Sequence, residues 1–150
     1  MTETYNNIMV AIDGSPEAEL AFVQGIHIAE RNQARLTLVH VIDTRALQSV
    51  TTFDGQIYEQ LQDDADRMMD EYDTRAREAG LHDIKTVIEF GNPKPILATQ
   101  IPDSEGIDLI LVGATGLNAF ERIMIGSSSE YILRHTKVDL LVVREGEKLI

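Results

Sequence analysis

Short apolar runs alternate with longer stretches of helical periodicity along the chain. The apolar runs are rich in β-branched and aliphatic residues, so they predict strands. We expect these strands at 8–12, 36–42, 84–90, 107–112 and 138–143. Helices are expected between them, at 16 to about 32, about 56–79, about 93–101 and about 127–135. The remaining stretches predict a loop at 44–55, a loop-like start to 114–126, and a polar tail from Arg144.

The two long helices carry specific start and stop signals. Ser15, Pro16 and Glu17 supply an N-cap hydroxyl, a proline at the first helical position and an acidic first turn. The apolar positions of this first helix are Ala18, Phe22, Gly25, Ile26 and Ala29. The second helix is amphipathic and ends at Gly80, a residue suited to the position after a helix. Its apolar positions are Leu61, Ala65, Met68, Tyr72, Ala76 and Ala79.

The polar face of the second helix is strongly acidic. Its carboxylates are Asp63, Asp64, Asp66, Asp70, Glu71 and Asp73. We interpret this cluster as a solvated helix face, with metal binding as the alternative.

Strands that alternate with helices predict an α/β fold with a parallel sheet covered by helices on both faces. In such sheets ligands bind beyond the carboxyl ends of the strands, where the strand order reverses. Functional residues are therefore expected in the loops after the first and fourth strands, at 13–15 and 113–116.

Length and composition exclude several classes of function. A chain of 150 residues is the size of one domain. With 13 Lys and Arg against 25 Asp and Glu, the net charge is −12, which argues against binding to nucleic acid or anionic lipid. A mononucleotide stays compatible, because backbone N–H groups bind phosphate without a basic surface. The absence of cysteine excludes disulfides, thiolate metal sites and cysteine nucleophiles.

Targeting signals are also missing from the pattern. No apolar run approaches the ~18–20 residues that span a bilayer, and residues 1–7 lack the features of a signal peptide. We therefore expect a soluble cytoplasmic protein that does not enter a membrane.

Two glycine-rich segments form the strongest candidate for chemistry. Gly113-Ala114-Thr115-Gly116 follows the fourth strand, and Gly126-Ser127-Ser128-Ser129 opens a helix. Glycine lets the backbone approach a ligand closely, and a helix N-terminus favours an anion. From these residues alone, a phosphate cradle and a simple helix cap are both open. The pattern is neither a Walker A loop nor the dinucleotide fingerprint G-x-G-x-x-G.

The spacing of these segments resembles a known family. Gly113, Gly116 and Gly126-Ser127 follow G-x2-G-x9-G-[S/T], which marks ATP-binding members of the universal stress protein family. The flanking I-D-L-I-L-V-G-A-T-G, the opening I-M-V-A-I-D-G-S and the second-strand L-V-H-V-I-D are also similar to the family. The resemblance covers about residues 7–144. It implies one universal stress protein domain over 1–150, with a Rossmann-like, adenine nucleotide alpha hydrolase-like fold and strand order 3-2-1-4-5.

The resemblance also implies where an adenine nucleotide binds. Asp13 matches the family aspartate on the adenine and ribose side, with Ala11 and Ile12 in the pocket wall. Val41 matches the position whose backbone meets the adenine ring. Read without the family, Asp13 would simply shape a turn and Val41 would belong to the core.

The glycine segments are expected on the ribose and phosphates. The ribose and phosphate turn comprises Gly113, Ala114, Thr115 and Gly116, with Asn118 nearby. The residues expected to hold the phosphates are Gly126, Ser127, Ser128 and Ser129. Mg²⁺ or Mn²⁺ would accompany ATP, but no metal ligand is identified. Arg122, the one cation of 114–126, either meets phosphate or is an exposed arginine.

Catalytic residues are not identified. The four histidines are scattered without metal-ligand spacing, and Ser127 has no evident base. Phosphoryl transfer needs a charged clamp and a group that positions water. We therefore expect an ATP-binding, nucleotide-responsive stress regulator with little or slow hydrolysis. The alternatives are an interaction module that works without nucleotide, and a slow ATPase.

The last strand predicts a partner. In the family's strand order, 138–143 lies at an edge of the sheet, yet its sequence V-D-L-L-V-V is nearly all apolar. An exposed apolar edge invites pairing with another strand. Because related proteins dimerise through this strand, we expect a homodimer, and a regulatory protein partner that the sequence does not name.

Overall fold

The computed structural model describes residues 4–47, 55–114 and 126–144. Five strands form one sheet of order β3-β2-β1-β4-β5, and every neighbouring pair is parallel. The strands are β1 (Asn7–Ala11), β2 (Arg35–Asp43), β3 (Ile84–Gly91), β4 (Leu109–Gly113) and β5 (Asp139–Val143). The predicted α/β class and strand order are confirmed, with β5 at one edge of the sheet.

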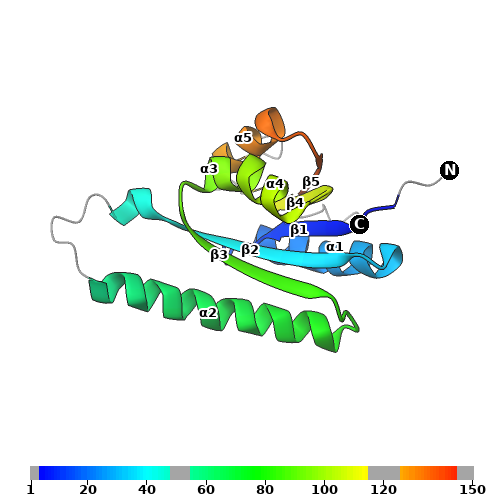
Figure 1. The fold of residues 1–150 in the computed structure, drawn as a ribbon, viewed down its shortest axis with the longest axis horizontal. Helices are drawn as coiled ribbons and strands as arrows, with labels where there is room; N and C mark the ends of the chain where they lie inside the picture. Colours follow the sequence, from blue (N-terminus) through cyan, green and yellow to red (C-terminus); the bar gives the residue numbers. More distant parts are fainter. Residues whose placement is uncertain (1–3, 48–54, 115–125, 145–150) are drawn as a thin grey trace, which may run out of the picture.

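The helices cover both faces of the sheet (Figure 1). On one face lie α1 (Pro16–Asn32) and α2 (Gly55–Glu78). On the other lie α3 (Pro93–Pro95), the π-helical turn η2 (Ile96–Gln100), α4 (Ile101–Glu105) and α5 (Ser127–His135). None of these helices, within the described ranges, is long and apolar enough to cross a bilayer.

Alternating residues of the central strands supply two separate cores. Ile8 and Val10 of β1 belong to the cluster under α1 and α2, whereas Met9 belongs to the cluster under η2, α4 and α5. In β2, Leu38 and Val39 divide in the same way. The central strands are thus apolar on both faces, as parallel strands buried between helices require.

The signals that bound the long helices act as predicted. The Ser15 hydroxyl accepts a hydrogen bond from the Ala18 N–H at 3.1 Å, with Pro16 as the first residue of α1. Gly80 has φ +105°, a left-handed conformation that glycine adopts without strain, and it follows the end of α2.

The buried stripe of α2 differs by one position from the prediction. Ala65, Tyr72 and Ala76 are buried as expected, but Met69 rather than Met68 completes the stripe. Met68 is half-buried and packs against the outside of the core cluster under α1 and α2. The last predicted apolar position of this helix is also wrong, because Ala79 lies beyond α2 and is exposed.

The helix predicted at about 93–101 continues to Glu105, past Pro102. The Ile101 N–H bonds to the carbonyl of Ile96, five residues back, so the helix widens just before the proline. This widening accommodates a residue that has no N–H to donate. The helix ends at Gly106, which has φ +68°.

The fourth strand begins two residues later than predicted, because the two residues before it form other hydrogen bonds. Ile107 donates its N–H to the carbonyl of Pro102 at 3.0 Å, closing the end of α4. The Asp108 carboxylate accepts the N–H groups of Asn6 and Asn7 at 2.8 and 3.1 Å. Both residues therefore precede β4, which starts at Leu109.

The remaining helix and strand boundaries agree with the prediction or differ from it by one residue. The stretch predicted as a loop at 44–55 begins with a 3₁₀ turn, η1 (Thr44–Leu47), and its last residue is the first of α2. β1 begins at Asn7, whose buried side chain accepts from the Thr37 hydroxyl at 2.7 Å and donates to the Glu105 carbonyl at 2.8 Å.

Candidate functional site

The best candidate site lies at the carboxyl ends of β1 and β4. From β1 the chain continues to β2 and β3 on one side, and it returns to β4 and β5 on the other. The strand order therefore reverses between β1 and β4, which is where sheets of this type bind ligands. We call this place the switch-point crevice. The name follows the general rule for such sheets and here denotes the Asp13–Ser15 turn, the end of β4 and the start of α5.

Gly113 brings the end of β4 against the start of α1. A Cβ atom at this position would lie 2.5 Å from the Glu17 carbonyl carbon and 2.7 Å from the Ala18 nitrogen. Real side chains do not tolerate such distances to backbone atoms. Only glycine fits without displacing α1, so this glycine is required by close packing between two backbones.

The first turn of α5 is tied to β4. The Ser129 hydroxyl donates to the carbonyl of Gly113 at 3.0 Å, and Ser129 is only 3% exposed. Ala114, which is also buried, donates its N–H to the Val143 carbonyl at 2.8 Å. The Ser129 bond holds the start of α5 at the end of β4, and the Ala114 bond joins the ends of β4 and β5. The Ser129 hydroxyl proton is thus used inside the protein.

The N-terminus of α5 places backbone N–H donors at the carboxyl end of the sheet. Gly126 is its N-cap residue, with φ −60° and ψ 157°, and its carbonyl accepts the Glu130 N–H at 2.9 Å. The first N–H groups of any α-helix lack carbonyl partners within the helix, and the helix dipole places partial positive charge there. Ser127 is exposed and Ser128 half-buried, so their hydroxyls are accessible beside these N–H groups.

The Asp13 side chain shapes the turn between β1 and α1. One carboxylate oxygen accepts the Ser15 N–H at 2.9 Å, and the side chain is exposed at the edge of the crevice. The turn uses one carboxylate oxygen of Asp13, so the predicted role on the adenine and ribose side would be a second role for the same side chain.

The predicted adenine side consists of the ends of β1 and β2. Ala11 and Val41 are half-buried and pack against the core cluster under α4 and α5. Ile12 is buried, and its N–H donates to the Val39 carbonyl at 2.7 Å. The Ile12 carbonyl lies 2.6 Å from Nδ1 of His40, a contact that the sequence did not predict.

Ten of the thirteen predicted binding residues can thus be placed. They all lie at the same end of the sheet: Ala11, Ile12, Asp13, Val41, Gly113, Ala114, Gly126, Ser127, Ser128 and Ser129. Thr115, Gly116 and Asn118 lie outside the described residues, as does Arg122.

No metal centre is found in the part of the chain that the structure describes, where no three His, Asp or Glu side chains cluster suitably. The acidic face of α2 is instead exposed and partly ion-paired, as in the pair Asp73–Arg77 at 3.0 Å. Within the same ranges, His40 and His135 face backbone carbonyls, and no imidazole is bonded to a serine hydroxyl.

Titratable groups are perturbed in two places. At the carboxyl end of β2, hydrogen bonds from Arg45 lower the pKa of Asp43. The second cluster lies between α1 and α2. Arg75 donates two hydrogen bonds to Glu19, one of them at 2.8 Å to Oε1, and these bonds lower the pKa of Glu19. Burial raises the pKa of Tyr72, helped by the nearby Glu19 charge. The Arg75 guanidinium also lies over the Phe22 and Tyr72 rings, so this cluster fastens α2 to α1.

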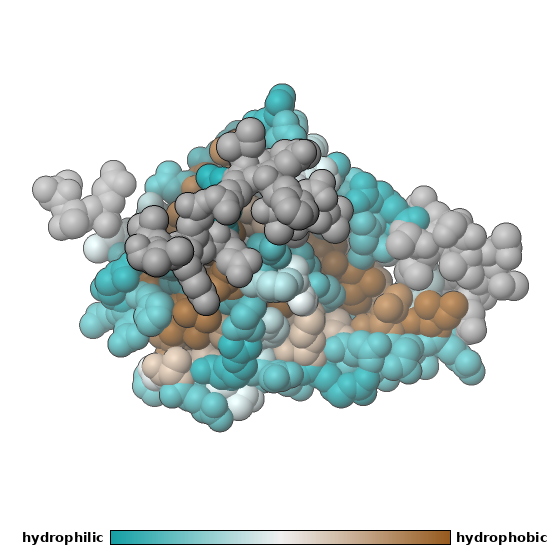
Figure 2. Space-filling view, turned by 180° about the vertical axis from the view of Figure 1, so that it is seen from behind, coloured by the Kyte–Doolittle hydropathy of each residue, from teal (hydrophilic) through white to brown (hydrophobic). Residues whose placement is uncertain are grey.

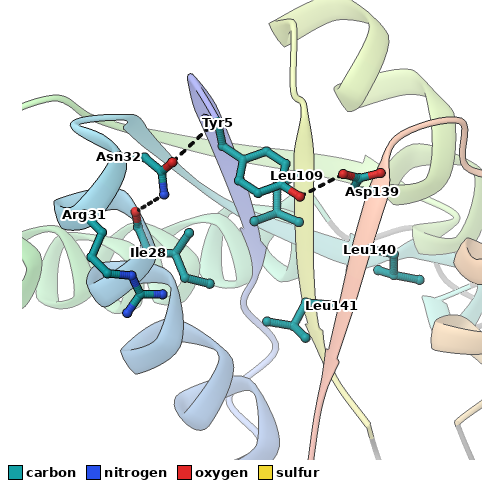
Figure 3. A pocket seen from close by; sticks show the side chains of 8 residues that line it. All are labelled: Tyr5, Ile28, Arg31, Asn32, Leu109, Asp139, Leu140 and Leu141. Atoms are coloured by element: carbon teal, nitrogen blue, oxygen red, sulfur yellow. Dashed lines mark hydrogen bonds between the residues drawn. The ribbon is translucent and has the colours of Figure 1, made fainter. Parts of the chain in front are cut away.

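A pocket of about 480 Å³ lies at the opposite end of the sheet, between α1 and β5 (Figure 3). Its floor is apolar, with Ile28, Leu109 and Leu141. The Tyr5 hydroxyl donates to Asp139 at 2.7 Å, and Asn32 accepts the Tyr5 N–H and donates to the Ile28 carbonyl.

Comparison with known proteins supports one family. Residues 4–144 match the model of the universal stress protein family. A putative universal stress protein from Staphylococcus haemolyticus is 43% identical over 144 residues, which cover 96% of this chain and 87% of that protein.

Solved structures agree. The universal stress protein UspA from Lactobacillus plantarum superposes with a TM-score of 0.78 at 32% identity, covering 95% of this chain and 100% of that one. A universal stress protein in complex with cAMP superposes with a TM-score of 0.65 at 27% identity, covering 94% and 98% of the two chains.

Proposed function

The chain belongs to the universal stress protein family, and from this premise we propose that it binds ATP in the switch-point crevice. The bound nucleotide would change the protein's contacts with a regulatory partner. Because the ligand is an intracellular metabolite, the proposal places the protein in the cytoplasm.

The observation that carries this proposal is the arrangement at the β4–α5 junction. Ser129 fastens the first turn of α5 to the end of β4, which places the N-terminus of α5 at the carboxyl end of the sheet. A helix N-terminus carries roughly +0.5 elementary charge, which suits phosphate in a protein whose net charge is −12. The donors are backbone groups, so no basic surface is needed.

The donor set fits a nucleotide with its own cation. Phosphate oxygens would bind the N–H groups of the first turn of α5 and the hydroxyls of Ser127 and Ser128. Mg²⁺ or Mn²⁺ would be held mainly by the phosphates and water, as Mg²⁺ often is in nucleotide sites. The exposed Asp13 carboxylate, at the turn after β1, would face the ribose.

Two further observations favour an adenine nucleotide. The complete spacing G-x2-G-x9-G-S is present at Gly113, Gly116 and Gly126. A protein of the same family, 27% identical, is in complex with cAMP, whose base is adenine. Slow hydrolysis is the enzymatic alternative, since no base for attacking water has been identified among the described residues.

Dimerisation through β5 is the second part of the proposal. β5 pairs only with β4 in the sheet, and Leu141 on it is 39% exposed. Figure 2 shows apolar side chains between hydrophilic ones across the middle of one face of the molecule. Pairing of two β5 strands would cover the open edge and shield Leu141 from water. A dimeric interaction module without nucleotide is the competing function.

Calorimetric titration with ATP and Mg²⁺ tests the proposal. We expect saturable binding to nucleotide-free wild type and loss of binding in Gly126→Val. The Gly126 backbone angles suit valine, so this variant adds bulk at the helix start without backbone strain. The matched control is Ala79→Val, at an exposed position between the end of α2 and the start of β3, and it should bind ATP normally. A folded wild type that binds no ATP would leave the interaction module as the better account.

A further inference from the structure

The end of β1 is fastened to β2 in an unusual way. β1 ends at Ala11, which is paired with Val39, and the next residue still donates its N–H to the Val39 carbonyl at 2.7 Å. The carbonyl of that residue, Ile12, lies 2.6 Å from Nδ1 of His40. A carbonyl oxygen only accepts hydrogen bonds, so Nδ1 carries the proton and donates.

The imidazole stands where a backbone donor would normally be. In a parallel ladder, successive residues direct their N–H and C=O groups alternately to the two neighbouring strands. The Val39 carbonyl accepts from Ile12, so the backbone N–H and C=O groups of Val39 and Val41 point toward β1. Those of His40 point toward β3. The next rung of the ladder would run from the Val41 N–H to the Ile12 carbonyl. In the described part of the chain, that carbonyl accepts no backbone N–H.

We propose that His40 is a positioning residue for the base of the bound nucleotide. By donating to the Ile12 carbonyl, its imidazole ends the β1–β2 ladder one rung early. The N–H and C=O of Val41 then point past the end of β1 into the switch-point crevice, as an adjacent donor and acceptor. This inference rests on the proposed function, because the ligand is the adenine nucleotide proposed above.

The pair of groups on Val41 selects among purine bases. Adenine offers an amino donor beside a ring-nitrogen acceptor, which matches a backbone C=O beside an N–H. Hypoxanthine offers a carbonyl acceptor beside an N–H donor, which is the reverse order. ITP differs from ATP only at this edge, and mismatched polar groups in a site are strongly disfavoured. Wild type should therefore prefer ATP to ITP.

The geometry is tested first in the nucleotide-free protein. Nitrogen-15 NMR of the imidazole should show a proton on Nδ1 of His40. Hydrogen exchange should show the Val41 amide much less protected than that of Val39, whose register partner Ala11 lies within β1. An Nδ1 that carries no proton, or equal protection of the two amides, would overturn the inference whatever the protein binds.

The link to the base is tested with variants. His40→Leu removes the donor, while His40→Asn retains a side-chain N–H near the position of Nδ1. His27→Leu, at an exposed position on α1, is the matched control. Titrations with ATP and with ITP should show that His40→Leu weakens ATP binding about tenfold, the effect of one lost hydrogen bond, and reduces the preference over ITP. His40→Asn should restore both, and His27→Leu should behave as wild type.

The outcomes separate this inference from the proposed function. If wild type and His40→Leu bind ATP equally and discriminate equally against ITP, the role of His40 is refuted while ATP binding stands. If folded wild type binds no ATP, the proposed function fails, and the base assigned to Val41 fails with it. The NMR and exchange measurements judge the imidazole contact independently of either result.

Discussion

Replacing Gly113 with alanine tests whether the end of β4 needs glycine for close packing. The added Cβ would lie 2.5 Å from the Glu17 carbonyl carbon and 2.7 Å from both the Ala18 nitrogen and the Glu17 Cβ. Ordinary van der Waals contact begins near 3.4 Å, so β4 and α1 must separate by several tenths of an ångström or more. Two of the three atoms belong to the backbone, which cannot rotate away as a side chain would.

The cost follows from this lack of freedom. Inserting one carbon into a packed interior typically costs about 1–3 kcal/mol. Because a helix backbone must move, we expect about 2 kcal/mol here. For a domain of this length that corresponds to a fall in Tm of roughly 4–8 °C. The shift would also disturb the Asp13–Ser15 turn that borders the crevice.

Urea unfolding of wild type and Gly113→Ala measures the effect, as a lower midpoint at unchanged m-value. The matched control is Gly55→Ala, the same chemical change at the first residue of α2, where a Cβ would meet nothing within 4 Å. It should be neutral or slightly stabilising. Equal stability of Gly113→Ala and wild type would refute the close-packing argument.

Three further predictions concern other contacts. Ser129→Ala removes the bond to the Gly113 carbonyl and should cost about 1 kcal/mol in urea unfolding; no loss would mean that this bond does not hold α5. Glu19→Gln should cost about 0.5–1 kcal/mol at pH 7, discounted because both partners are 38% exposed. Since Arg75 lowers the folded pKa of Glu19, this contribution is present above the unfolded pKa of about 4.3 and disappears as pH falls through the folded value. The same urea series at lower pH should therefore show the two proteins converging, and a pH-independent difference would contradict the ion-pair argument. Leu141→Lys should convert a dimer of twice 16.7 kDa to monomer in analytical ultracentrifugation, while Leu133→Lys, 54% exposed on α5, should not; a monomeric wild type would refute the dimer.

Much of the fold could be predicted because its signals are chemically specific. Ser15 and Pro16 start a helix, and Gly80 ends one, through groups that act on their own backbone neighbourhood. The start of β1 at Asn7 and the continuation of the helix past Pro102 could not be predicted, because both depend on distant or unusual hydrogen-bond partners. Asn7 is acceptable in a buried strand only because Thr37 and Glu105 satisfy its amide.

The candidate site shows the same division. The residues at the ends of β1 and β4 could be located from the alternation of strands and helices and from the glycine spacing. The contact between Gly113 and the Glu17 backbone could not, since it depends on how closely α1 packs on β4. The role of His40 was also missed, because a histidine at a strand end gives no sign that it replaces a ladder donor.

Amide chemical-shift mapping during an ATP and Mg²⁺ titration tests the central claim most directly. The account predicts the largest changes at the switch-point crevice, at Val41, Gly113 and Gly126 to Ser128. It predicts little change at Tyr5 and Asp139 in the pocket at the opposite end of the sheet. Changes centred on that pocket, or none anywhere in a folded, nucleotide-free protein, would contradict the assignment of the crevice as the nucleotide site.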